Sequence, residues 1–565
     1  MTWRIGVFGK GIGALSAAHE LTQGERGQHY DVTVIGPADG LGGKAVSYTA
    51  DGLPPAKAGF PAEHGFRFFP AFYRHVIDTM AHIPSRYPIA GRATVKDHLH
   101  PTPLRLVARK GEDPIVMPSA ARPADLNLLI SALIQMFKES LGIPWSEGWF
   151  FIGKLLDMAR CPWDEKMARY EQVSWWDFIE AERKSVNYRR YLAMGLTHTL
   201  VAADPREINA KTGGDVLIRI LFDTGFGGAS DADRVLDGPT QRVWIDPWRD
   251  ELSARGVHFQ DGELVSIDAD GATGHVKAAL VKQPNGSVNS LSFDQYVSGL
   301  PVEDMTEVLR HSPALKGRGL DGIETLAGDV RSMTGMQFYL KEPLSDIARN
   351  CGHQIFLDSP WAVTGIVQTA FWRPPFDDLS QVGDGDVKAV WSVIASNWKR
   401  PYGADGIDAE HATLDQWKDC TVAQLQEGLN TKNSPRFDPA TVAAWHLDRA
   451  VTPRDPSDAN GVSVNRMPLL VNHPKRWELR PPAVSTKLPN FALAADYVRT
   501  NTDLATMEAA NEAARRAVNG VLDRTGVGAP RCAIFKLYLP EALGAGEEQL
   551  LNQAVIYNAQ RWVDV

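Results

Sequence analysis

The sequence is poor in the features that mark exported, metal-binding or membrane-spanning proteins. Its 565 residues include four cysteines, which form no CxxC pair, no zinc spacing and no disulfide framework. This cysteine usage fits a reducing compartment, so we expect a cytoplasmic protein. No run of about 18 uncharged apolar residues occurs, so no membrane-spanning helix is expected. The first ten residues, MTWRIGVFGK, predict a buried strand in place of a signal segment.

Clusters of basic residues are missing as well. Lys and Arg total 59 against 68 Asp and Glu, which gives a formal net charge of −9. Domains that bind nucleic acid carry basic patches, so we expect no nucleic-acid partner. The motifs GxSxG, HExxH and GxxxxGKS/T are also absent, and no metal cluster is expected. The remaining composition, 44% hydrophobic and 22% charged, is that of a globular protein with several domains.

A glycine-rich turn near the start of the chain predicts a dinucleotide site. A short strand, Arg4–Phe8, runs into a GxGxxA turn, and a helix over Leu15–Leu21 and a strand over Asp31–Ile35 complete a βαβ unit. In such units the glycines allow the tight turn and the approach of a pyrophosphate, and a small residue lets helix and strand pack closely. The N-terminus of the helix then faces the phosphates. The candidate cofactor residues are Gly9, Gly11, Gly13 and Ala14.

The end of the second strand departs from the usual dinucleotide site. An acidic residue is expected there to bind the adenosine ribose, but the position holds Gly36. The loop that follows supplies no arginine for an NADP phosphate, so either Asp39 or a water molecule would have to reach the ribose. Next comes a Gly42-Gly43-Lys44 turn. Its glycines and its lysine form either a second phosphate contact or an ordinary surface turn.

At four places the sequence resembles the superfamily of flavin-containing amine oxidases and phytoene desaturases. The first is the GxGxxA turn with its downstream Leu41–Lys44 loop. The second is EHGFRFFPAFY, residues 63–73, which is similar to a segment that carotene-desaturase-like members place beside the flavin. The third consists of residues 236–240 and 244–248, which are similar to the start of the middle piece of the family's FAD-binding domain. The fourth, 491–511, resembles the C-terminal flavin motif, with Ala495 and Ala509 where glycine is usual.

The resemblance implies an α/β fold. Its core is a Rossmann-like FAD-binding domain, glutathione-reductase-like and discontinuous, with an inserted α+β substrate-binding domain that has a helical part. Strand-like segments are predicted at Val257–Ile267, Val276–Lys282, Tyr296–Leu300 and Phe491–Ala494. The predicted boundaries are 1–80, 234–301 and 487–530 for the FAD-binding domain, 81–233 and 302–486 for the substrate-binding domain, and 531–565 for a C-terminal tail.

The resemblance also implies residues around the flavin ring. Gly65, Phe66 and Phe68 would border the isoalloxazine. Arg67 would stabilise negative charge on the flavin or hold a polar substrate group, or it would form a salt bridge. His64 would exchange a proton near neutral pH, or serve a structural role. Arg67 and His64 are therefore the candidate catalytic residues.

Three further cofactor contacts follow from the same resemblance. Asp496 would bind the ribityl chain or a water on the pyrophosphate. A helix that starts near Thr502 and Asp503 would direct its N-terminus at the flavin, with Thr506 and Met507 beside the pyrimidine edge. Val265 would contact the adenine through its backbone, or it is an ordinary buried strand residue.

The substrate is expected to be extended and apolar. The segment 123–143 has a wide apolar helical face, which forms core, lines a substrate entrance, or touches a membrane edge. The aromatic segments 336–339, 356–361 and 371–372 would supply pocket walls or core. We predict an FAD-dependent oxidoreductase that transfers hydride from a polyene or isoprenoid-like compound in natural-product biosynthesis, with desaturation as its reaction. The alternatives are a cyclase or isomerase of a polyene, driven by NADPH, an amine oxidase, and a nucleotide-binding scaffold without activity.

Overall fold

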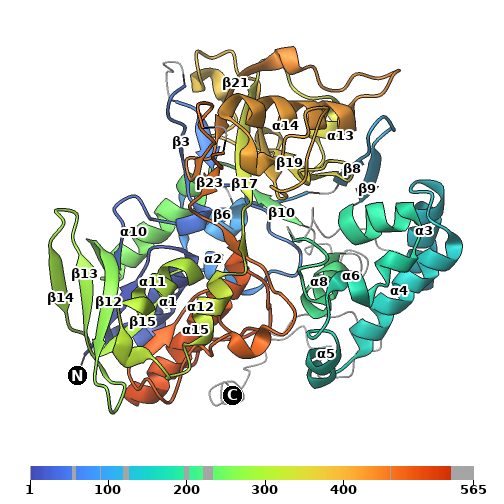
Figure 1. The fold of residues 1–565 in the computed structure, drawn as a ribbon. Coiled ribbons are helices and arrows are strands. Elements are labelled where there is room, and N and C mark those ends of the chain that lie inside the picture. The colour runs from blue at the N-terminus through green and yellow to red at the C-terminus, as the bar shows by residue number, and fades with distance from the viewer. Residues whose placement is uncertain are drawn as a thin grey trace.

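The structure is a computed structural model. It describes residues 2–53, 59–89, 91–102, 104–118, 126–195, 203–220, 233–458 and 460–535. In Figure 1 the sheet that contains β17, β19 and β21 lies at the top, the sheet of β12, β13 and β14 lies at the left, and helices α3 to α8 lie at the right. The part of the predicted tail beyond residue 535 lies outside the described residues.

A five-stranded parallel sheet is assembled from three distant stretches of the chain. Its strand order is β11-β2-β1-β15-β25, and each neighbouring pair is parallel. The strands are β1 (Trp3–Phe8), β2 (Tyr30–Gly36), β11 (His258–Asp261), β15 (Gln295–Ser298) and β25 (Phe491–Leu493). These strands come from each of the three predicted FAD-binding pieces. The Rossmann-like, discontinuous α/β fold is thereby confirmed, and the exact boundaries stay predictions.

Two helices rich in alanine pack on this sheet. Helix α1 (Ile12–Thr22) follows β1, and α15 (Met507–Thr525) follows β25 and lies against α1. Alanines such as Ala17 and Ala517 are fully buried between them, because small side chains let helices approach closely. Also on this domain are α10 (Asp246–Ala254), α11 (Val302–Arg310), α12 (Gly322–Ala327) and an antiparallel sheet of β12 (Glu263–Ala269), β13 (Val276–Lys282) and β14 (Val288–Leu291).

Two sequence-based expectations for this domain are wrong. The strand expected over Val257–Ile267 is two strands, since Gly262, with φ of +156°, separates β11 from β12. The helix expected to start near Asp503 starts at Met507, and Thr506 is its cap, with its side chain accepting from the Ala509 N–H. Asp503 instead adopts φ of +43°, and its carboxylate is taken up by a buried cluster described below.

A mixed seven-stranded sheet forms the α+β part. Its order is β21-β17-β20-β19-β18-β8-β9, and α14 (Leu414–Leu429) packs against it. The strands are β8 (Leu104–Ala108), β9 (Ile115–Pro118), β17 (Thr334–Leu340), β18 (His353–Phe356), β19 (Val363–Val367), β20 (Ala389–Ala395) and β21 (Val442–Leu447). Phe338, Phe356, Trp361 and Trp391 are buried in one apolar core here. Most of the expected wall aromatics are therefore core.

The helical part supports the core interpretation of the segment 123–143. It contains α3 (Leu126–Glu139), α4 (Trp145–Arg160), α5 (Trp163–Arg169), α6 (Trp175–Phe178) and α8 (Ala210–Ile218). Ile130, Leu133, Ile134 and Phe137 of α3 are buried, and the Phe137 ring lies 6.1 Å from that of Phe151 on α4. Residues 119–125 lie outside the described residues. Among the described helices, none is both long and apolar enough to cross a bilayer.

The remaining short elements connect these parts. They are β3 (Ser47–Thr49), β4 (Pro61–Glu63), α2 (His75–Met80), β5 (Pro84–Ile89), β6 (Arg92–Thr94), β7 (Leu99–Pro101), β10 (Arg234–Leu236), β16 (Val330–Arg331), α13 (Asp346–Arg349), β22 (Val451–Thr452), β23 (Val464–Asn465) and β24 (Leu469–Leu470). Strands β3 and β4 pair with each other, and β4 contacts β17, so the segment after β4 lies between the two large sheets.

A buried charge cluster joins the helical part to the domain of the five-stranded parallel sheet. Lys211 of α8 donates to the Asp503 carboxylate at 2.7 Å and lies 3.5 Å from Asp215. Arg480 lies 3.3 Å from Asp503, and Lys166 donates to Asp215 at 2.9 Å. Burial alone would raise the pKa of Asp215, but Lys166, Lys211 and Arg219 hold it well below its ordinary value.

We expect Asp215→Asn to lower the free energy of unfolding by about 3 to 5 kcal/mol, because it leaves buried cations without their partner. Chemical denaturation followed by tryptophan fluorescence measures this loss. Since the folded pKa of Asp215 is depressed, its contribution is present above about pH 4 and is lost as the pH falls towards the folded pKa. The exposed pair Asp346 and Arg349 is the control, and Asp346→Asn should leave the midpoint unchanged. Equal midpoints for the two variants would contradict the assignment.

Candidate functional site

A cavity of about 410 Å³ lies at the carboxyl ends of the parallel strands. Its walls come from the turn after β1, the loop after β2, the residues 299–304 after β15, and the residues 494–496 after β25. Two further segments, 64–68 and 505–507, close its far side. Ligands of open parallel sheets bind at this edge, so the cavity is the candidate site.

Backbone meets backbone where these loops converge. A Cβ atom built on Gly13 would lie 1.8 Å from the Ala494 carbonyl oxygen, and one on Gly43 would lie 2.8 Å from the Gly11 Cα. The Gly42 N–H donates to the Lys10 carbonyl at 2.8 Å. The N-terminal turn, the loop after β2 and the C-terminal motif therefore touch directly and form one cradle.

Gly11 is the open point of this cradle. The nearest atom to a Cβ built there is the Gly43 Cα at 3.8 Å, so that side faces the cavity. Gly11 is also the residue before α1, and α1 has no side-chain cap. The first N–H groups of the helix thus have no capping side chain, as a phosphate site requires. These residues fit the pyrophosphate of a dinucleotide.

Most of the predicted site residues line this cavity. The lining includes Gly9, Gly11, Gly13, Gly42, Gly43, Lys44, His64, Gly65, Phe66, Arg67, Phe68, Asp496, Thr506 and Met507. Ala14 lies behind the turn, where a Cβ on Gly299 would come within 2.8 Å of its own Cβ, so a small residue is needed there. Besides Ala14, two predicted residues do not line the cavity in the described part of the chain. Asp39 is exposed, and Val265 is half-buried at a bulge of β12, so both assignments stay predictions.

Lys44 is paired across the cavity rather than free. Its ammonium donates to Glu303 Oε1 at 2.7 Å and to the Pro468 carbonyl. Burial raises the pKa of Asp496, and Lys44 opposes that rise. Burial and the neighbouring Glu303 raise the pKa of Asp304 to about 6. The carboxylates of Glu303, Asp304 and Asp496 thus form a cluster with Lys44 in the cavity wall.

The cavity also has apolar walls and cationic side chains. Its apolar lining residues are Phe66, Phe68, Tyr73, Met333, Ile394, Met467 and Leu469. Arg67 turns back on its own segment, where it donates to the Gly65 carbonyl and lies 4.0 Å from Glu63. Burial lowers the pKa of Arg67, and Glu63 opposes this effect. Arg67 therefore combines a local ion pair with a position on the cavity wall.

His64 is held by a buried carboxylate that the sequence did not reveal. Its Nδ1 lies against Asp448 Oδ2, and Asp448 follows β21. The Tyr48 hydroxyl donates to Asp448 Oδ1 at 3.0 Å, and burial, with the nearby Asp448, keeps the pKa of Tyr48 above its ordinary value. A His whose Nδ1 faces a carboxylate has Nε2 left to exchange a proton.

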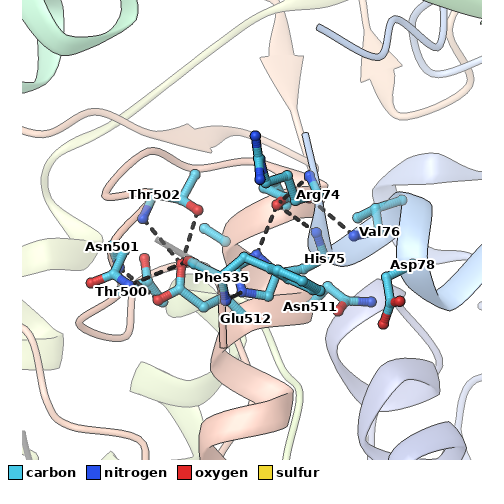
Figure 2. A network of polar contacts seen from close by, with 12 residues as sticks. Arg74, His75, Val76, Asp78, Thr500, Asn501, Thr502, Asn511, Glu512 and Phe535 are labelled. Atoms are coloured by element: carbon cyan, nitrogen blue, oxygen red, sulfur yellow. Dashed lines mark hydrogen bonds and ion pairs between the residues drawn. The ribbon is translucent and has the colours of Figure 1, made fainter. Parts of the chain in front are cut away.

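Two glutamates of α15 hold the loops that border its N-terminus. Glu508 accepts from the backbone N–H groups of residues 74, 75 and 76 at 2.7–3.0 Å. Glu512 accepts from the N–H groups of Asn501 and Thr502 at 2.6 and 3.1 Å, and Figure 2 shows both residues beside it. The start of α15, with Thr506 and Met507, is thereby fixed against the cavity.

Comparisons with known proteins agree with this geometry. A family model described as an NAD(P)-binding Rossmann-like domain matches residues 7–83. Cyclohexylamine oxidase from Brevibacterium oxydans has a similar structure, with a TM-score of 0.55 and 14% identity over 93% of this chain and 100% of that chain. Putrescine oxidase bound to putrescine has a TM-score of 0.57 and 10% identity, over 93% and 99% of the two chains. The chain therefore shares its overall fold with these two amine oxidases.

An oxidoreductase from Methanosarcina mazei shares the amine oxidase fold as well, with a TM-score of 0.56 and 11% identity over 92% of this chain and 100% of that chain. No curated protein sequence matches this chain. These identities are low, so the likeness concerns the fold and does not extend to the substrate.

Several residues at this site were missed by reasoning from the sequence. Asp448 and Tyr48 are far apart in the chain from each other and are not part of a motif. Lys10 stands between the first two glycines, and its amine pairs with Asp261, 251 residues away. The presence of a charged residue at that place in the turn was the one available signal, since it demands a partner when buried.

Gly13→Ala and Gly11→Ala form a matched pair that tests the cradle. The methyl group at position 13 would collide with the Ala494 carbonyl, so we expect a loss of at least about 3 kcal/mol of stability. The methyl at position 11 enters open space, and the loss should stay within about 1 kcal/mol. Thermal unfolding of both variants measures the difference. Similar melting temperatures would show that the two loops do not meet as described.

Proposed function

We propose that the protein is an FAD-dependent oxidoreductase that removes hydride from an extended apolar substrate. One observation carries the proposal, namely a single cavity that joins a dinucleotide cradle to apolar walls. The cradle residues are those at which a pyrophosphate fits, and the far walls suit a compound without charge. The similar amine oxidase structures support a flavin enzyme.

The described residues suggest a place for each part of FAD. The first turn of α1 and the Gly42–Gly43 loop would hold the pyrophosphate, and Asp496 would accept from the ribityl hydroxyls. The segment Gly65–Phe68 and the start of α15 would hold the ring. When bound, FAD supplies the hydride acceptor. The positive end of the α15 dipole favours negative charge on the nearby pyrimidine edge.

The charge beside the cavity's phenylalanines supports a neutral substrate over an amine. Arg67 lies in the same segment as Phe66 and Phe68, and Arg466 also lines the cavity. Guanidinium groups disfavour a protonated amine, whereas a polyene or isoprenoid would lose no charge pairing on entry. Of the carboxylates that would attract an amine, Glu303, Asp304 and Asp496 line the cavity, and Glu303 is already paired with Lys44.

Desaturation needs a base in addition to the hydride acceptor, because one carbon loses hydride and its neighbour loses a proton. His64 lines the cavity, and Asp448 holds its Nδ1. We assign the proton to His64 Nε2, with Asp448 stabilising the imidazolium that forms. Tyr48 keeps Asp448 oriented.

Amine oxidation is the second candidate, because two similar structures are named cyclohexylamine oxidase and putrescine oxidase. The aromatic residues Phe66, Phe68 and Tyr73 at the cavity wall could contact an uncharged amine. This candidate differs from the first in the compound that reduces the flavin, and that difference is measurable.

The purified protein should carry FAD, and Asp496→Ala should remove most of it. The reason is that Asp496 lines the cavity and its carboxylate would accept from the ribityl hydroxyls. Absorbance at the flavin band, divided by protein concentration, measures the flavin per chain. Asp294→Asn is the control, since Asp294 pairs with Arg4 and does not line the cavity. Full occupancy in Asp496→Ala would refute this assignment, and a colourless wild-type protein that stays colourless with added FAD would favour the scaffold alternative.

Under anaerobic conditions we expect a detergent-solubilised polyene to bleach the bound flavin, and putrescine or cyclohexylamine to leave it oxidised. Asp448→Asn should slow bleaching by about 10²- to 10⁴-fold without loss of flavin, because His64 would lose its charge partner. Stopped-flow absorbance measures both effects. Bleaching by an amine alone would establish the second candidate. Rapid bleaching by NADPH would favour the reductive cyclase instead.

A further inference from the structure

We propose that Lys10 and Asp261 together anchor the adenosine ribose of the bound dinucleotide, in place of the acid that β2 lacks. The inference rests on the proposed function, since it concerns the adenosine half of FAD. It explains why Gly36 stands at the end of β2, and it identifies two residues to which no family motif points.

The lysine occupies the space that a side chain at position 36 would need. A Cβ atom built on Gly36 would lie 2.8 Å from Lys10 Cγ and 3.1 Å from the Lys10 backbone nitrogen. Contacts of this kind leave no room for a glutamate with the present Lys10 conformation. The glycine at position 36 and the lysine at position 10 therefore depend on each other, and together they differ from the usual dinucleotide site.

The ammonium group of Lys10 is buried and oriented. The side chain is 5% exposed, and its Nζ donates to Asp261 Oδ1 at 2.6 Å and to the Pro37 carbonyl at 3.1 Å. An ammonium carries three N–H donors, so these two contacts leave one donor for a ligand. Lys10 lines the cavity, as does Pro37. The remaining donor is therefore available at the end of the cavity next to β2.

Asp261 brings an acid to the same edge from the neighbouring strand. It is the last residue of β11, and its register partner on β2 is Gly36 itself. The Gly262 N–H donates to the Gly36 carbonyl at 3.0 Å, which fixes the two strand ends together. The Asp261 side chain is 51% exposed, and Lys10 bonds to only one of its two oxygens. Its other oxygen can accept from a ribose hydroxyl.

The pair therefore offers one donor and one acceptor to the two vicinal hydroxyls of a ribose. A carboxylate on β2 would offer acceptors alone. Lys10 is the contact residue in this assignment. Asp261 has two tasks: it positions the ammonium by an ion pair, and it accepts from the second hydroxyl.

Binding of FAD and of FMN, measured side by side, tests the proposal. Lys10→Met keeps the stem over Gly36 and removes the ammonium, and Asp261→Asn removes the acid. Each should weaken FAD binding by about 10- to 100-fold, the range for a hydrogen bond to a charged group. FMN lacks the adenosine, so its affinity should not change. Quenching of flavin fluorescence on titration of the flavin-depleted protein gives both dissociation constants.

A matched control is available on the same sheet. Asp294 pairs with Arg4 at the opposite, amino end of the strands, where the two side chains are also partly exposed. Asp294→Asn should bind FAD and FMN as the wild-type protein does. A second arm restores the usual site: in a Lys10→Ala background, Gly36→Glu should recover FAD affinity, whereas Gly36→Glu with Lys10 present should not.

The outcomes separate this inference from the proposed function. Unchanged FAD affinity in Lys10→Met and Asp261→Asn would overturn the ribose assignment, while the flavin itself stays established. An equal loss of FAD and FMN would also overturn it, because the pair would then support the glycine turn and not the ribose. If the wild-type protein binds neither flavin, the proposed function fails and the inference with it.

Discussion

The contact between the Gly13 backbone and the Ala494 carbonyl is the constraint on which the rest of the site depends. It joins the first and last motifs of a chain in which nearly 500 residues separate them. The parallel sheet makes the contact possible, because β1, β15 and β25 are neighbours whose carboxyl ends share one edge. Gly43 and Gly299 meet the same turn from two further loops. The glycine turn, the loop after β2, the residues after β15 and the residues after β25 thus pack backbone against backbone. The cavity lies where these four segments meet.

Much of the fold could be predicted because its signals are local. The glycine turn, the β-branched strands and the alanine-rich last helix each carry their pattern within about 20 residues. The site residues that belong to motifs were found for the same reason. Pairs formed across the chain could not be predicted, as Lys10 with Asp261 and His64 with Asp448 show. The start of α15 was misplaced because Lys211, on another domain, takes the carboxylate of Asp503 that would otherwise cap a helix.

The cavity combines two kinds of lining. Glu303, Asp304 and Asp496 line it together with Lys44, and burial raises the pKa of Asp304 and Asp496. Aromatic and aliphatic side chains line it as well, together with Arg67 and Arg466. One cavity therefore offers both polar and apolar contacts to what it binds.

The Lys211–Asp503 pair limits the movements by which a large ligand could reach the cavity. The pair is buried at the junction of α8 with the loop before α15, with Arg480 and Asn472 around it. A rigid-body rotation of the helical region away from the parallel-sheet domain would separate these buried charges from their partners. Such a separation has a high energetic cost. We therefore expect a large ligand to enter through small displacements of loops and side chains, while the helical region and the parallel-sheet domain keep their relative positions.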